Sequence, residues 1–225
     1  MNTGKWTKAR IIFLGGMFGW LGTTSLSGAG AATNELDLPE VSLVDEGTVA
    51  EVPTPPVGAT RDFVGPVAGV NCSHWEVVAS PDKDTLLSAC GEYKIHLKRS
   101  ENLNMQKLTA AGDKTVMEFE PAYPVVAFPL EVGKHWHRQY TGHAAVADAT
   151  WSGDMTCDVA DFGEIKVAAG AFKAFRIECI DAWKMGPATT HYTLTTWYAP
   201  SIKSVVKSLN YEDPHMSTEL KAYVN

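Results

Sequence analysis

The sequence lacks the short motifs that identify most enzyme classes. It contains no Gly-x-Ser-x-Gly turn, no His-Glu-x-x-His helix, no phosphate-binding Gly-rich loop and no dinucleotide fingerprint. Each of these motifs holds a nucleophile, a metal or a phosphate where its chemistry requires it. We therefore predict that the protein is not an enzyme and uses no cofactor.

The chain also lacks a run of basic residues. It has 19 Lys and Arg against 26 Asp and Glu, which gives a formal net charge of −7. Nucleic acid and anionic lipid headgroups repel a surface of this sign. Nucleic acid is therefore excluded as an expected partner.

Long apolar runs are absent except at the N-terminus, where residues 11–26 follow Lys5, Lys8 and Arg10. A basic start, an apolar stretch and a small-residue segment at 27–32 are typical of a signal peptide. We predict a signal peptide over 1–32. An uncleaved anchor is the alternative, but a bilayer span needs roughly 20 apolar residues and this stretch is shorter.

Cleavage is expected after Ala31 or Ala32. No Cys follows the small-residue site, so the lipoprotein route has no acceptor. Removing the signal leaves 16 basic and 26 acidic residues, a formal charge of −10. The prediction is a periplasmic or extracellular protein with no stable membrane insertion after cleavage.

The mature chain divides into two parts by composition. Residues 33–66 are rich in Pro, Gly, Val, Thr and acid, with Pro-Thr-Pro-Pro at 53–56 and few aromatics. Such a segment cannot bury enough apolar surface to fold alone, so it is predicted to be a linker or arm, with Phe63 docking on the domain. Residues 67–225 are predicted to form a single β domain.

Four cysteines, Cys72, Cys90, Cys157 and Cys179, lie in the mature part. An even count in an exported chain predicts disulfides. Three pairings are open, and the turn-like segments between neighbours favour Cys72 with Cys90 and Cys157 with Cys179. Two metal-binding pairs are disfavoured, because neither has the short spacing of a zinc site.

Short alternating runs bounded by Gly, Pro and Asp follow Cys72 and predict strands rather than helices. Two segments, 84–89 and 103–111, are predicted to be single helical turns. The fold class is therefore all-β, an antiparallel meander that forms a curved sheet, half-barrel or barrel with little helix. The predicted strands cover 74–79, 92–98, 115–120, 134–141, 146–159, 164–167, 172–183, 189–198, 203–210 and 217–223.

Several segments carry a pattern known from other secreted proteins: FPLEVGKHW at 128–136, YTG at 140–142, VAAGAFKAFRI at 167–177 and WYAP at 197–200. Over about residues 121–209 the chain resembles secreted bacterial β-domains of unknown function, the TapB-like family. The shared motifs shape strands and turns, so the resemblance implies a fold and no particular activity.

His135 and His137 are the candidate metal ligands. Two residues apart on a strand, they leave the same face about 7 Å apart, and two imidazoles can hold a transition metal if a third ligand joins them. His143, His191 or Asp148 could supply it. The alternative is two solvent-facing residues opposite a buried Trp136, and it is favoured.

The aromatic residues after Val70 either fill the core or line a ligand cavity, with core filling as the default. A concave aromatic face would suit an apolar ligand. The candidate ligand-binding residues are Trp136, Trp151, Trp183, Trp197 and Tyr198.

Three functions remain open. The first is an exported non-catalytic β-domain that binds an apolar small molecule or an envelope component. The second is a structural or assembly subunit of a cell-envelope complex, in which the arm at 33–66 docks on a partner protein. The third is a hydrolytic or metal-dependent enzyme.

Overall fold

The computed structural model describes residues 52–225. The predicted signal peptide at 1–32, with its cleavage after Ala31 or Ala32, lies outside the described residues and stays a prediction. The first part of the predicted arm, residues 33–51, lies outside them as well. The rest of that arm belongs to the described fold.

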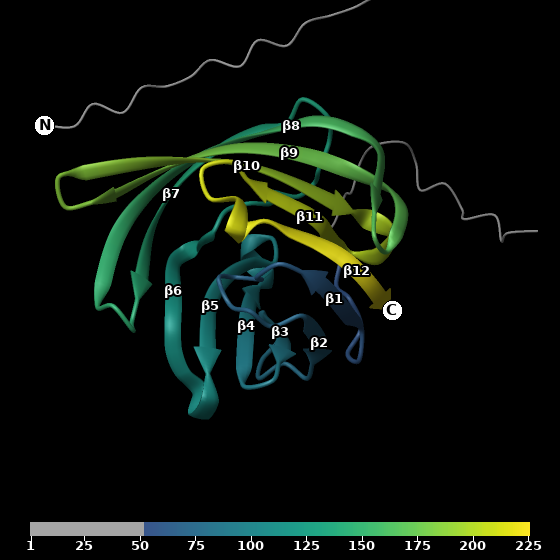
Figure 1. Ribbon diagram of the computed structural model, residues 1–225, viewed down its shortest axis with the longest axis horizontal. Helices are drawn as coiled ribbons and strands as arrows, with labels where there is room; N and C mark the ends of the chain where they lie inside the picture. The colour runs from purple at the N-terminus through teal and green to yellow at the C-terminus, as the bar shows by residue number, and fades with distance from the viewer. Residues whose placement is uncertain (1–51) are drawn as a thin grey trace, which may run out of the picture. The chain divides into compact units, whose positions relative to one another are not determined.

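Twelve antiparallel strands form one closed barrel in the described part of the chain (Figure 1). Each strand pairs with its sequence neighbours, and β1 closes the ring by pairing with both β2 and β12. This confirms the all-β antiparallel meander, in its barrel form. Closure removes the exposed sheet edges that a meander would otherwise leave. The strands are β1 (Thr60–Val64), β2 (His74–Val78), β3 (Thr85–Cys90), β4 (Tyr93–Lys98), β5 (Asn104–Ala110), β6 (Lys114–Tyr123), β7 (His135–Ala144), β8 (Ala149–Val167), β9 (Gly170–Met185), β10 (Ala188–Ala199), β11 (Ser204–Asn210) and β12 (Thr218–Val224).

The helices of the described chain are short 3-10 turns: η1 (Arg99–Glu101), η2 (Ala111–Asp113), η3 (Pro200–Ile202) and η4 (Pro214–Met216). In residues 52–225 no helix combines the length and the apolar character that crossing a membrane requires.

Side-chain alternation along the long strands decides which residues fill the barrel. On β9, Ile177, Cys179 and Asp181 are buried, whereas Glu178 and Ile180 between them are exposed. Successive side chains of a strand point to opposite faces. One face of β9 therefore builds the interior, and the other faces solvent.

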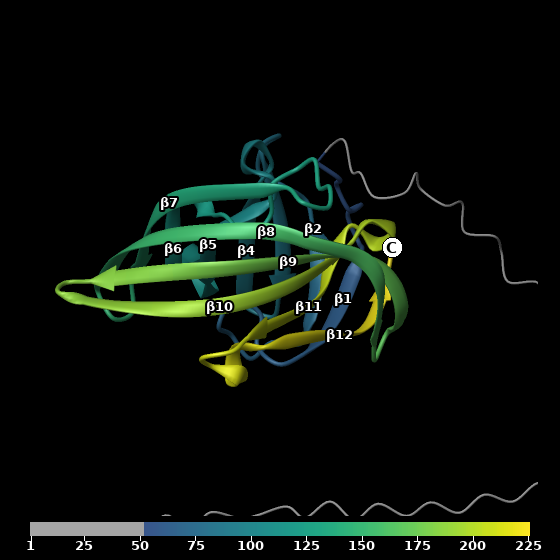
Figure 2. The same ribbon diagram turned by 90° about the horizontal axis from the view of Figure 1, so that it is seen from above.

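The β8–β9 hairpin bends over the end of the barrel and packs beside β12 (Figure 2). The Ala169 amide donates to the Leu220 carbonyl at 3.2 Å. Under this hairpin, Phe172, Val206 and Leu220 form a small buried cluster separate from the main core. The hairpin thus covers apolar side chains of the last two strands.

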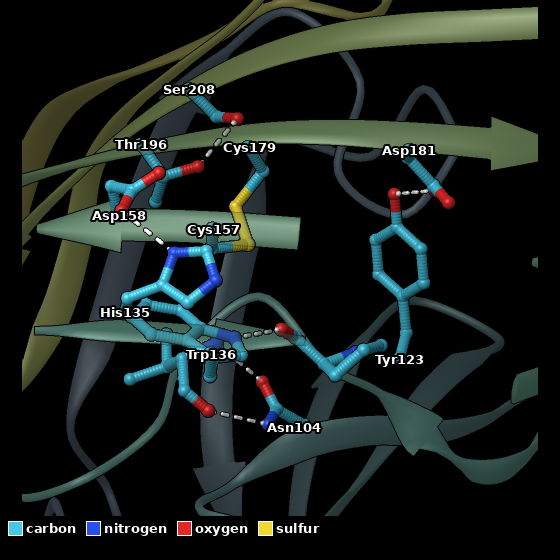
Figure 3. Close-up of a disulfide and its surroundings, with 12 residues drawn as sticks. Asn104, Tyr123, His135, Trp136, Cys157, Asp158, Cys179, Asp181, Thr196 and Ser208 are labelled. Atoms are coloured by element: carbon cyan, nitrogen blue, oxygen red, sulfur yellow. Dashed lines mark hydrogen bonds and ion pairs between the residues drawn. A yellow bond between two sulfur atoms is a disulfide. The ribbon is translucent and has the colours of Figure 1, made fainter. Parts of the chain in front are cut away.

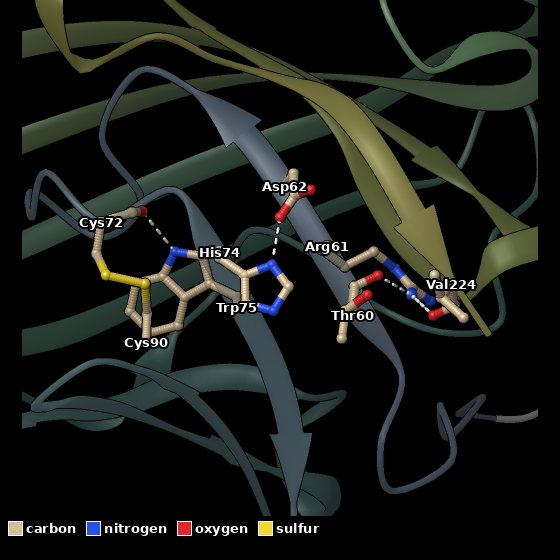
Figure 4. A network of polar contacts seen from close by, with 8 residues as sticks. All are labelled: Thr60, Arg61, Asp62, Cys72, His74, Trp75, Cys90 and Val224. Atoms are coloured by element: carbon tan, nitrogen blue, oxygen red, sulfur yellow. Dashed lines mark hydrogen bonds and ion pairs between the residues drawn. A yellow bond between two sulfur atoms is a disulfide. The ribbon is translucent and has the colours of Figure 1, made fainter.

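Two disulfides brace the barrel, in the pairing that the spacing favours. Cys72–Cys90 joins the segment before β2 to the end of β3, beside the buried ring of Trp75 (Figure 4). Cys157–Cys179 joins directly opposed residues of β8 and β9 in the interior (Figure 3). Both bridges close short loops, with sequence separations of 18 and 22 residues.

The barrel begins earlier than predicted. The linker prediction for 33–66 is wrong for Thr60–Val64, which form β1 and pair with two strands. The preceding segment also lies on the barrel: Pro55 is buried, and the Arg99 side chain donates to the Thr54 hydroxyl. A segment poor in apolar residues can still form a strand when both neighbours supply hydrogen bonds.

Two helix predictions are wrong. Residues 84–89 lie mostly in β3 and residues 103–111 mostly in β5, and each of these strands pairs with both neighbours. The sequence of β5, NMQKLTA, is rich in helix formers, yet tertiary pairing overrides so weak a preference. The predicted strands at 146–159 and 164–167 are one strand, β8, which passes through a register shift between Val159 and Asp161.

Candidate ligand-binding cavity

A cavity of about 550 Å³ lies inside the barrel and opens to solvent. Its walls come from β4, β5 and β6 on one side and from β9, β10 and β11 on the other, with the loop after β1 and the turn before β12. Ligand pockets in proteins measure about 300–1,000 Å³. The cavity is therefore large enough for a small organic molecule.

Most of the lining side chains are apolar. The residues are Phe63, Pro66, Val67, Ala68, Gly69, Ile95, Leu97, Leu103, Asn104, Met105, Met117, Phe119, Tyr123, Val125, Val126, Trp183, Tyr192, Leu194, Thr196, Val205, Ser208, Asn210, Asp213, Met216 and Thr218. Three are methionines, whose flexible thioethers adapt to irregular ligands. Rings of Phe119, Tyr123, Trp183 and Tyr192 add flat apolar surface.

Asp181 holds the aromatic side chains of the cavity lining in place through hydrogen bonds. Its side chain is fully buried, and its Oδ2 atom accepts a hydrogen bond from Tyr123 Oη at 2.9 Å (Figure 3). The same atom accepts from Tyr140 Oη at 2.6 Å and from Trp183 Nε1 at 2.5 Å. The Oδ1 atom has no hydrogen-bond partner among the described residues. Tyr123 and Trp183 line the cavity, so one carboxyl group orients two of its rings.

Burial sets the proton affinities of this cluster. Desolvation raises the pKa of the Asp181 carboxyl, although its three donors act in the opposite direction. Desolvation and the nearby carboxyl also raise the pKa of Tyr123 and of Tyr140. Both phenols are therefore neutral donors at physiological pH, and their rings present an uncharged wall.

Two glycines make room for the rings behind this wall. A Cβ atom on Gly153 would overlap the Tyr140 ring, and one on Gly142 would overlap the Trp151 ring. Trp151 in turn stacks on Trp183, with ring centroids 5.0 Å apart. Each glycine lies opposite an aromatic residue on the neighbouring strand, and its missing side chain leaves room for that ring.

A side-chain amide holds the loop between β6 and β7 in the barrel. Asn104 Nδ2 donates to the Val126 carbonyl at 2.7 Å, and the Val126 amide donates to Asn104 Oδ1 at 3.0 Å. Both Asn104 and Val126 line the cavity. The loop is therefore fixed as a part of the wall.

The predicted ligand-binding residues divide between core and cavity. Only Trp183 of the five lines the cavity. Trp136, Trp151 and Tyr198 are buried in the main core, where Trp136 Nε1 donates to the Pro124 carbonyl at 3.0 Å. Trp197 packs against the cluster under the β8–β9 hairpin. Four of the five candidates therefore pack the protein and do not face the cavity.

His135 and His137 lie on the outer face of β7, and Trp136 between them is buried. His135 Nδ1 lies 2.8 Å from Asp158 Oδ1, and His137 Nε2 lies 2.6 Å from Asp154 Oδ1. Each imidazole thus has its own carboxylate partner. In the described part of the chain, no three His, Cys, Asp or Glu side chains gather as a metal site.

Asp181 belongs to the candidate site but was not predicted from the sequence, although a signal for it exists. It shares the inward face of β9 with Ile177, Cys179 and Trp183. An acid at an inward position of a predicted strand indicates a buried polar cluster. The cavity residues on β5 were missed because that strand was predicted to be helical.

Comparison with known proteins finds structural likenesses at low sequence identity. No protein-family model matches the chain, and no curated protein matches it, so the resemblance to the TapB-like family stays a prediction. A solved structure provisionally described as a lipoprotein of Parabacteroides distasonis ATCC 8503 has a TM-score of 0.44 and 10% identity, and the match covers 78% of this chain and 99% of that one. An exported protein with a YmcC-like fold from Bacteroides fragilis NCTC 9343, also provisionally described, has a TM-score of 0.44 and 10% identity, with 79% and 100% covered.

Proposed function

We propose that the protein is an exported, non-catalytic β-barrel domain that binds an apolar small molecule in its interior cavity. The observation that carries this proposal is the cavity of about 550 Å³ with a mostly apolar lining. Burying an apolar ligand there gains roughly 25 cal/mol for each Å² removed from water. Small closed barrels hold single ligands in the same way.

Export is proposed from two independent features of the chain. Residues 1–32 have the pattern of a signal peptide. Two disulfides involve all four cysteines, and disulfides persist in oxidising compartments such as the periplasm and the extracellular space. Nucleic acid is not a proposed partner, because the chain is acidic.

A binding role rather than catalysis is proposed from the hydrogen bonds of the buried Asp181 carboxyl. Asp181 lies behind the rings of Tyr123 and Trp183, and both rings give their polar hydrogen to it. This arrangement explains Asp181 as a positioning group for the cavity wall. A general acid or base would instead need to reach a bound substrate.

The proposal is tested by titrating the folded, signal-free protein with N-phenyl-1-naphthylamine, an uncharged probe that fluoresces in apolar surroundings. We expect saturable binding, displaced by other apolar compounds. Met117→Trp on β6 fills the cavity and should weaken probe binding by about tenfold, which is 1.4 kcal/mol. Leu97→Trp fills it from β4 and should do the same.

Glu118→Trp is the matched control. Glu118 follows Met117 directly in β6, but its own side chain is exposed. It should leave probe affinity within about twofold of the parent value. Thermal unfolding of all variants checks that each is folded. Failure of the folded parent protein to bind the probe, or equal affinity in all four proteins, would overturn the cavity as the binding site.

A further inference from the structure

The charge of the cavity lining limits what the cavity can bind. Among the described residues that line it, none is Lys, Arg or His, and the single charged side chain is that of Asp213. An ionised carboxylate or phosphate loses its hydration on entering an apolar site and needs a cation there in compensation. The lining formed by residues 52–225 offers no such cation.

Most of the polar side chains of the lining lie on one wall. Thr196 and Ser208 face each other on β10 and β11, with hydroxyl oxygens 3.3 Å apart, and Figure 3 shows this pair. Asn210 and Asp213 continue the same wall at the β11–β12 turn, where Asn210 Oδ1 accepts from the Asp213 amide at 2.8 Å. These four residues, with Thr218, form the polar wall.

The opposite side offers a ligand almost no free polar atom. It is built from Ile95, Leu97, Met105 and Met117. Asn104 also lies there, but both ends of its amide are bonded to Val126. The cavity is therefore apolar on one side and has hydroxyl and amide groups and one carboxylate, that of Asp213, on the other.

We infer that the cavity selects amphipathic molecules whose head group is uncharged and forms hydrogen bonds, such as long-chain alcohols, and discriminates against fatty-acid anions and phospholipids. This inference rests on the proposed ligand-binding function. The Thr196–Ser208 pair is long for a hydroxyl hydrogen bond, so either group can pair with a ligand hydroxyl at little cost. Asp213 adds repulsion against an anionic head group.

The inference is tested by competition of 1-decanol and decanoate against N-phenyl-1-naphthylamine, at about pH 8 so that decanoate is ionised. The chains have equal length and differ in the head group. We expect 1-decanol to bind at least about tenfold more tightly. Thr196→Val keeps the shape of the side chain and removes its hydroxyl, and should weaken 1-decanol by about threefold with little effect on the probe.

Asp213→Lys places a cation on the polar wall. It should strengthen decanoate by about tenfold and leave 1-decanol within about twofold. Asp148→Lys makes the same charge change at a fully exposed turn and is the control. Asp213→Asn removes the negative charge without adding a positive one. It should therefore strengthen the binding of decanoate only slightly.

The outcomes separate the two proposals. Absence of probe binding to the folded protein refutes ligand binding itself. Probe binding with equal affinity for decanoate and 1-decanol refutes the inference alone, because the site would then accept an anion without a counter-charge. An equal gain for decanoate in Asp213→Lys and Asp148→Lys would refute it as well, since the effect would come from net charge.

Discussion

Arg61 on β1 donates a hydrogen bond from Nη1 to the carbonyl oxygen of Val224 on β12 at 2.8 Å (Figure 4). The same guanidinium donates from Nη2 to the Ile202 carbonyl at 2.7 Å. Arg61 is only 6% exposed, and desolvation lowers the pKa of its guanidinium. One buried side chain therefore links the first strand of the barrel to its last strand and to η3.

Replacement of Arg61 by Met should destabilise the barrel at the closure. The variant keeps much of the apolar stem but removes the donor to the buried Ile202 carbonyl and to the partly buried contact with the Val224 carbonyl, at a cost of about 3 kcal/mol. Chemical denaturation measures the loss in free energy of unfolding. Arg138→Met, at an exposed residue of β7, is the control and should change stability by less than about 0.5 kcal/mol. Similar losses in both variants would show that the Arg61 contacts do not secure the closure.

Gly153→Ala should be strongly destabilising, because the added Cβ atom would overlap the Tyr140 ring. Overpacking of this kind costs about 3 kcal/mol when a ring or a backbone must move. Gly163→Ala in the same strand is the matched control. Its Cβ atom would meet only the Asp161 side chain, with Oδ2 at 3.3 Å, and that side chain can rotate. The denaturation midpoints of the two variants are compared. Equal losses of stability would disprove that Gly153 is needed to make room for the Tyr140 ring.

The strands that the sequence predicts are those with strong alternation. From Phe175 to Asp181 on β9, buried side chains alternate with more exposed ones, which is the pattern that indicates a strand with one inward face. β3 and β5 lack this signal. β5 is composed largely of helix formers, and its strand form depends on hydrogen bonds from β4 and β6, which no local pattern reveals.

The position of the cavity could not be predicted from the sequence for a related reason. Trp136 and Trp183 are both inward-facing aromatic residues on predicted strands, yet one fills the core and the other lines the cavity. The difference depends on what lies across the barrel. The loop between β6 and β7 packs against the inner wall on one side and leaves space on the other. Such placement is tertiary information.

Asp181 should make stability depend on pH in a direction opposite to that of most carboxylates. Folding raises its pKa above the unfolded value of 3.8, so the native state binds the proton more tightly. Its contribution to stability is therefore most favourable below about pH 4 and is lost as pH rises through the folded pKa. Asp181→Asn removes this dependence. The free energy of unfolding of the parent, relative to Asp181→Asn, should fall as pH rises above about 4 and then level off.

Asp154 is the opposite-sign control for this experiment. Hydrogen bonds from Gln139 and His137 lower the pKa of the Asp154 carboxyl, so its stabilising effect is present above the unfolded value of 3.8 and is lost as pH falls through the folded pKa. Relative to Asp154→Asn, the parent should gain stability as pH rises through this range. Urea unfolding at a series of pH values measures both differences. Slopes of the same sign would contradict the buried, desolvated state of Asp181, and with it the view that this carboxyl orients the rings of the cavity wall.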